Sequence, residues 1–87
     1  MDQQHRIKVE IFGHTYTLRG PSEPEHLQRI AAFVDQKMRD IYEKNSQLDL
    51  QTLAVLTALN LADTYEELLA EYEALVDSLE VHQNQDE

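Results

Sequence analysis

The chain has 87 residues, no cysteine and a formal net charge of −10 at pH 7. This length allows one small domain, and the lack of cysteine excludes disulfide bonds and thiolate metal sites. All seven Lys and Arg residues precede Asn45, whereas ten of the seventeen carboxylates follow it. A nucleic-acid binder gains affinity by neutralising phosphates, so the acidic second half argues against nucleic acid as a partner.

The chain also lacks the signals of export or membrane insertion. Its first residues, Met1-Asp-Gln-Gln-His-Arg, contain no apolar signal core. The most apolar stretch, residues 53–62, is too short to cross a bilayer. We therefore expect a cytoplasmic protein.

Residues 6–19 predict a hairpin of two short antiparallel strands. Apolar and polar side chains alternate over 6–12, which is typical of a strand with one buried face. Gly13-His14 suits a two-residue type II′ turn because Gly comes first, and a return strand over 15–19 follows. The side chains on the predicted inner face are Ile7, Val9, Ile11, Tyr16 and Leu18. A lone hairpin is marginal in water, so a helix or a partner's strands must support it.

A first helix is predicted over about residues 23–44. Ser22 can cap it, Glu25 sits at the capping-box position, and Pro24 is tolerated in the first turn. Apolar residues at helical spacing predict one buried face, with Phe33 partly off that row. The row consists of Leu27, Ile30, Ala31, Val34, Met38, Ile41 and Tyr42.

A long second helix is predicted over residues 49–82. Ser46 or Asp49 can cap it, and no Gly or Pro interrupts the chain after Asn45. We therefore divide the chain into an N-terminal head (1–48), this helix, whose first part packs on the head, and a frayed tail (83–87).

Apolar residues recur along the second helix at alternating spacings of four and three, as in a coiled coil. These residues are Ala54, Ala58, Leu61, Tyr65, Leu68, Tyr72, Leu75 and Leu79. In heptad notation they occupy positions a and d, which face a partner helix. A further row occupies position e and consists of Val55, Ala62, Leu69 and Val76. We call these a, d and e positions the apolar seam, and its width suits a bundle of more than two helices.

The seam predicts self-association. The alternative is that the second helix folds back on the first within one chain. The first helix is shorter, however, and already has to cover the hairpin. We therefore expect an oligomer interface made by Ala58, Leu61, Tyr65, Leu68, Leu69, Tyr72, Leu75, Val76 and Leu79.

No residue pattern indicates catalysis or metal binding. The four histidines lie on four separate predicted elements, and none has the i, i+4 spacing of a helical metal site. Asp63, Glu66 and Glu67 form an acidic cluster, but heptad positions f, b and c place it on the solvated face. We expect no enzyme activity, no cofactor and no metal.

Three segments, taken in order, resemble the ZapA family of bacterial cell-division proteins. They are Ile7-Lys-Val-Glu-Ile-Phe-Gly13 with Tyr16 and Leu18 after it, Val34-Asp-Gln-Lys-Met38, and Leu53-Ala-Val-Leu-Thr-Ala-Leu-Asn-Leu-Ala-Asp63. The resemblance covers about residues 6–80, and the last segment is the most specific.

The resemblance implies a mainly α fold with a small β-hairpin, an α+β head followed by a long coiled-coil helix. It implies homodimers that pair into antiparallel dimers of dimers. It also implies heads that bind FtsZ, the tubulin-like division GTPase. Such a protein cross-links FtsZ filaments at mid-cell, promotes Z-ring assembly and septation, and has no enzyme activity. The alternative from a different class is a generic coiled-coil scaffold that binds another cytoplasmic protein through its head.

The family's partner binding implies contacts at the hairpin and at the junction between the helices. The matching positions are His14, Thr17, Tyr42, Lys44 and Ser46, and Arg19 can add a charge nearby.

Overall fold

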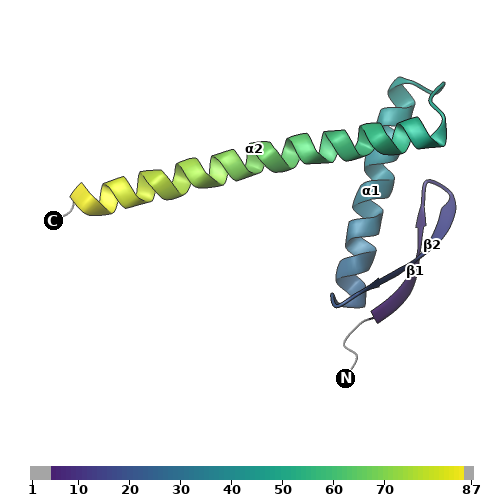
Figure 1. Ribbon diagram of the computed structural model, residues 1–87, viewed down its shortest axis with the longest axis horizontal. Coiled ribbons are helices and arrows are strands. Elements are labelled where there is room, and N and C mark those ends of the chain that lie inside the picture. Colours follow the sequence, from purple (N-terminus) through teal and green to yellow (C-terminus); the bar gives the residue numbers. More distant parts are fainter. Residues whose placement is uncertain (1–4, 86–87) are drawn as a thin grey trace. The chain divides into compact units, whose positions relative to one another are not determined.

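The computed structural model describes residues 5–85 and shows a hairpin followed by two helices (Figure 1). Strands β1 (His5–Ile11) and β2 (His14–Gly20) pair antiparallel in a two-stranded sheet. Helix α1 spans Pro24–Lys44 and helix α2 spans Leu50–Gln85. The predicted fold class, mainly α with a small β-hairpin and a long C-terminal helix, is confirmed.

The chain divides into two compact units, the first ending at Thr57 and the second beginning at Ala58. The hairpin, α1 and the first two turns of α2 therefore belong to the first unit. The second unit is the remainder of α2. Of the tail predicted over 83–87, the last two residues lie outside the part of the chain that the structure describes.

The hairpin turn lies one residue earlier than the sequence pattern predicted. Phe12 and Gly13 connect the strands, with φ angles of 50° and 79°, and Ile11 pairs with His14. Two successive positive φ angles fit a type I′ turn, so the predicted type II′ turn at Gly13-His14 is wrong. The pattern missed it because a bulky residue such as Phe rarely takes a positive φ.

The same residues form the inner face of the hairpin despite this change of turn. Each residue of β1 meets a partner two positions away from the predicted one, and side chains of a strand alternate with a period of two. Ile7 therefore lies opposite Leu18, and Val9 opposite Tyr16, on the predicted face. Tyr16 nevertheless remains 43% exposed, because α1 packs mainly on β1.

The core of the first unit is small. Val9 of β1 and Ala31 and Met38 of α1 are buried, and Leu53 of α2 is completely inaccessible to solvent. Thr57, one turn after Leu53, is also buried, and its hydroxyl donates to the Leu53 carbonyl oxygen at 2.7 Å. The first turns of α2 thus complete this core without leaving a buried hydroxyl unpaired.

The helix starts are set by Pro24 and Asp49. Pro24 restrains Glu23 to an extended conformation, so α1 begins at Pro24 with Glu23 as its cap. Glu23 makes no side-chain cap hydrogen bond, and the Ser22 cap predicted from the sequence is wrong. Of the two caps proposed for the second helix, the structure selects Asp49, whose Oδ1 accepts the Thr52 backbone N–H at 2.8 Å. This bond lowers the pKa of Asp49 below its usual value.

Leu53→Ala should destabilise the first unit strongly. Removing a fully buried leucine side chain leaves a cavity and typically costs about 2–5 kcal/mol of unfolding free energy. Urea denaturation at fixed protein concentration measures this loss. Gln51→Ala, at an exposed position of the same helix turn, should change stability by less than about 0.5 kcal/mol. Equal effects of the two substitutions would contradict the placement of Leu53.

Candidate protein-interaction surfaces

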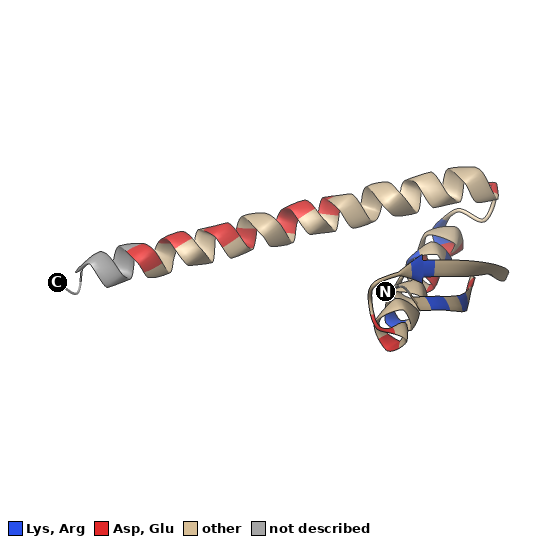
Figure 2. Cartoon of the chain, turned by 60° about the horizontal axis from the view of Figure 1, so that its bottom comes forward, with Lys and Arg blue, Asp and Glu red and all other residues tan. Residues whose placement is uncertain are grey.

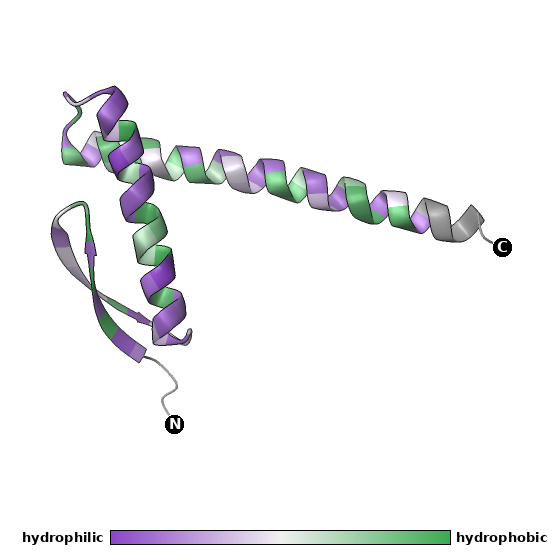
Figure 3. Ribbon diagram, turned by 180° about the vertical axis from the view of Figure 1, so that it is seen from behind, coloured by the Kyte–Doolittle hydropathy of each residue, from purple (hydrophilic) through white to green (hydrophobic). Residues whose placement is uncertain are grey.

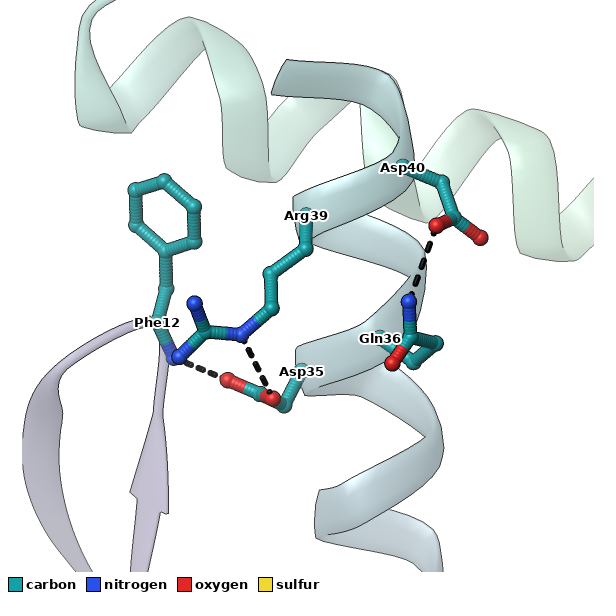
Figure 4. A network of polar contacts seen from close by, with 5 residues as sticks. All are labelled: Phe12, Asp35, Gln36, Arg39 and Asp40. Atoms are coloured by element: carbon teal, nitrogen blue, oxygen red, sulfur yellow. Dashed lines mark hydrogen bonds and ion pairs between the residues drawn. The ribbon is translucent and has the colours of Figure 1, made fainter. Parts of the chain in front are cut away.

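The hairpin turn is held on α1 by the carboxylate of Asp35 (Figure 4). The Phe12 backbone N–H donates to Asp35 Oδ1 at 2.7 Å, and the Arg39 Nε–H donates to Asp35 Oδ2 at 2.9 Å. The guanidinium carbon of Arg39 lies 5.8 Å from the centroid of the Phe12 ring. We call Phe12, Asp35 and Arg39 the turn clamp. Phe12 has a positive φ angle, which is an unfavourable backbone conformation for this residue. The hydrogen bond from its N–H to Asp35 helps to hold that conformation.

An aromatic contact fixes the same turn against the end of α1. The Phe12 and Tyr42 rings meet edge to face, with their centroids 5.2 Å apart and an interplanar angle of 68°. His14 directly follows the turn, so the structure brings it to the end of α1 that carries Tyr42 and Lys44. His14 and Lys44 are exposed, and Tyr42 is partly exposed.

The other predicted partner-binding residues lie elsewhere. Arg19 is five residues beyond His14 on β2, which is about 17 Å along a strand, and Thr17 lies between them. Ser46 is exposed in the short link between the helices. The structure therefore gathers His14, Tyr42 and Lys44 at one end of the hairpin and places Arg19 at the other.

The outer face of the hairpin carries a cationic group that the sequence analysis missed in part. Arg6 lies directly opposite Arg19, and Lys8 lies opposite Thr17. Like charges opposite each other destabilise a strand pair. Glu10 lies on the same face, but among the described residues the one ion pair within 4.0 Å joins Asp35 to Arg39, so no carboxylate pairs with these cations there. The alternation of β1 already placed Arg6 and Lys8 on this face and could have identified them.

Hydrophobic residues recur along α2 (Figure 3), and the apolar seam that they form is largely open to solvent in a single chain. Five of its large side chains are more than half exposed: Tyr65 62%, Leu68 59%, Tyr72 64%, Leu75 59% and Leu79 54%. Of the other predicted interface residues, Ala58 is exposed, and the partly exposed ones are Leu61, Leu69 and Val76. Acidic residues are distributed along α2, which carries no Lys or Arg (Figure 2). An apolar row of this size on a solvated helix marks an interaction site.

The described residues show no other kind of site. They contain no group of three or more His, Asp or Glu side chains that could hold a metal ion. None of the helices in the described range 5–85 is long and apolar enough to cross a membrane. The two ends of the hairpin and the apolar seam are the surfaces that carry the residues predicted from the sequence to bind partners.

Comparisons with known proteins agree on one family. The family model for cell division protein ZapA matches residues 7–87. A cell division protein ZapA from Geobacillus sp. (strain WCH70) is 44% identical over 85 residues, which cover 98% of this chain and 95% of that protein. One from Bacillus pumilus (strain SAFR-032) is 48% identical over 70 residues, or 80% of this chain and 82% of that protein.

A solved structure gives the same result. The structure described as a ZapA mutant dimer from Geobacillus stearothermophilus superposes with a TM-score of 0.72 and 41% sequence identity. The match covers 92% of this chain and 93% of that one. The resemblance noted in the sequence is therefore confirmed for both sequence and fold.

Asp35→Asn should weaken the head in a pH-dependent way. The hydrogen bond from Arg39, followed by that from the Phe12 backbone N–H, holds the pKa of Asp35 below its usual value. The charged carboxylate therefore stabilises the fold above the unfolded-state pKa of about 4, and this contribution is lost as the pH falls through the lower folded-state pKa. The variant should melt below the native protein at pH 7, and the difference should shrink in acid.

Asp40→Asn is the matched control for this measurement. Within the described part of the chain, the Asp40 carboxylate accepts only from Gln36, one turn earlier on α1, at 2.9 Å. Its loss should leave the turn in place and the melting temperature close to that of the native protein. Identical melting of Asp35→Asn and the native protein at pH 7 would show that the turn clamp contributes no stability.

Proposed function

Because the chain belongs to the ZapA family of cell division proteins, we propose that it is a non-enzymatic division factor that binds FtsZ and cross-links its filaments. The observation that carries this proposal is the separation of two kinds of surface. The apolar seam occupies α2, whereas the cationic and aromatic groups of the head occupy the hairpin and α1. One surface joins copies of the chain, and the other remains available for the filament.

The seam supports a homodimer that pairs into a tetramer. Five of its large side chains are more than half exposed in one chain, and covering them releases about 25 cal/mol for each Å² of apolar area removed from water. The similar solved structure is described as a dimer. The apolar e row widens the contact beyond what two helices need, which favours a dimer of dimers.

The head supports recognition of a protein surface. The turn clamp holds the hairpin turn in one conformation, so little entropy is lost when His14 and the end of α1 meet a partner. Arg6 and Arg19 add an unpaired cationic face that suits partner carboxylates. We assign FtsZ contact to two groups of residues. The first is His14, Tyr42, Lys44 and Ser46, and the second is Thr17 and Arg19 together with Arg6 and Lys8.

Multivalency supplies the mechanism of bundling. A single head that binds weakly releases a filament quickly, but heads joined through α2 rebind at a high effective concentration. Two or four heads on one assembly can hold neighbouring filaments together. This action at the mid-cell division site would promote Z-ring assembly.

Leu68→Asp combined with Leu75→Asp should convert the oligomer into monomers. Each substitution places a carboxylate in the centre of the seam, where burying an unpaired charge costs several kcal/mol. Light scattering should report the mass of one chain. Ala70→Asp combined with Ala74→Asp adds the same charge at exposed positions f and c of the same helix and should keep the native mass. An unchanged mass for the seam variant would exclude the seam as the interface.

Co-pelleting with FtsZ tests the proposed function itself. GTP-dependent pelleting with thick bundles in the microscope is expected for the native protein. The monomeric seam variant should bind filaments weakly without bundling them, because it carries one head. A folded oligomer that does not pellet with FtsZ filaments would refute the proposal and favour an adaptor for a different protein.

Arg6→Gln combined with Arg19→Gln should weaken FtsZ binding about two- to tenfold, since exposed charge pairs are each worth up to about 1 kcal/mol. The loss should be smaller at high salt, where screening already weakens the contact. Gln28→Glu combined with Ala32→Glu changes the net charge equally at exposed positions of α1. This control should bind like the native protein, and equal losses would show that only net charge matters.

A further inference from the structure

The outer face of α1 carries an apolar pair that the hairpin does not cover. Ile30 is 45% exposed and Phe33 is 48% exposed, although the sequence pattern placed Ile30 in the buried row. The reason is geometric, because α1 packs mainly on β1 and buries only a narrow arc, centred on Ala31 and Met38. Two large apolar side chains are thus left on a solvated helix.

Cations flank this pair. Lys37 Nζ lies 5.6 Å from the centroid of the Phe33 ring, and Arg29 is exposed one turn before Phe33. We call Arg29, Ile30, Phe33 and Lys37 the α1 outer face. The spacing of Ile30, Phe33 and Lys37 is three and then four residues, which presents one row to a neighbouring helix. Neither Arg29 nor Lys37 has a carboxylate within 4.0 Å among the described residues.

The charges exclude one simple occupant. Two α1 outer faces packed on each other would bring four cations together around a small apolar contact. Like charges at that distance repel and lower affinity. The face instead requires a helix whose apolar row is bordered by carboxylates.

Helix α2 has such a flank. Leu69 belongs to the e row of the seam, and Glu66 and Glu73 lie beside it at heptad position b. Both carboxylates are exposed, and Leu69 is partly exposed. At 1.5 Å per residue, Glu66 and Glu73 are about 10 Å apart along the axis and Arg29 and Lys37 about 12 Å. Each pair of charges therefore brackets one apolar centre at similar spacing.

We propose that the α1 outer face of one copy docks on the flank of α2 formed by Glu66, Leu69 and Glu73 of a second copy. Phe33 packs on Leu69, and the two cations meet the two carboxylates. This contact adds a helix beside the a/d pairing of α2 and gives Leu69 of the e row a further apolar partner. It concerns assembly of the chain with itself and does not depend on FtsZ binding.

Disulfide trapping tests the contact directly, because the native chain has no cysteine. A Phe33→Cys chain mixed with a Leu69→Cys chain should form a mixed disulfide under mild oxidation. Phe33→Cys mixed with Ala74→Cys, at position c on the far side of α2, is the matched control. The yield of the first pair should exceed that of the control by about tenfold, since two cysteines form a disulfide only when their Cα atoms are within about 7 Å of each other. The yield should fall as salt screens the unlike charges.

Charge reversal in the same two cysteine chains tests the contribution of the ion pairs. Two cysteine chains that both carry Arg29→Glu and Lys37→Glu should cross-link about five- to tenfold less, because two unlike pairs become like pairs. Adding Glu66→Lys and Glu73→Lys to both chains should restore the yield. Circular dichroism checks that each variant remains helical.

Three outcomes would overturn the proposal. The first is equal yields for Leu69→Cys and Ala74→Cys. The second is a yield unaffected by charge reversal in variants that remain helical. The third is a disulfide that forms only when both cysteines lie on the same chain, which would mean that α1 meets its own α2.

Discussion

The stability of a single copy is limited chiefly by the small amount of apolar surface that it can bury. Among the described residues the buried hydrophobic side chains are Val9, Ala31, Met38 and Leu53, whereas twelve large hydrophobic side chains are exposed. A chain of this size buries a smaller fraction of its surface than a larger domain does. Association of copies is the physical remedy, and the exposed residues fall in rows along helices, which is the form that helix packing uses.

The turn clamp decides how the head is presented. A type I′ turn needs positive φ angles at both central residues, and Phe12 is poorly suited to one of them. Asp35 compensates by accepting the Phe12 N–H, and Tyr42 compensates by packing on the ring. Backbone strain of this kind persists only where surrounding contacts hold it. Here those contacts also fix the turn beside the end of α1, where the head is proposed to meet its partner.

Charge separation along the chain serves both proposed surfaces. The cations lie on the hairpin and α1, and α2 bears carboxylates alone. Ion pairs can thus form between α1 of one copy and α2 of another. By contrast, α2 helices that pair through the seam repel one another, because their outer faces are both acidic. Ionic strength would shift the balance between these two contacts in opposite directions.

The sequence predicted the secondary structure well because each element has a clear period. Alternation defined the hairpin, and the four-three repeat defined α2. The order of three motifs identified the family, which the comparisons confirmed. The exposed seam also follows from the repeat, since position in a heptad fixes the side of the helix. Charge and periodicity are local properties, so a single sequence contains them.

Tertiary structure decided what depends on distant residues. The turn falls at Phe12 and Gly13 because Asp35, 23 positions away, stabilises an unfavourable φ angle there. Ile30 is exposed because α1 packs mainly on β1, which helical periodicity cannot reveal. The pairing of Arg6 with Arg19 likewise depends on register. The sequence by itself thus determined the elements, the seam and the charge separation. Packing between elements determined which side chains remain free to bind, because burial depends on neighbours that local patterns do not specify.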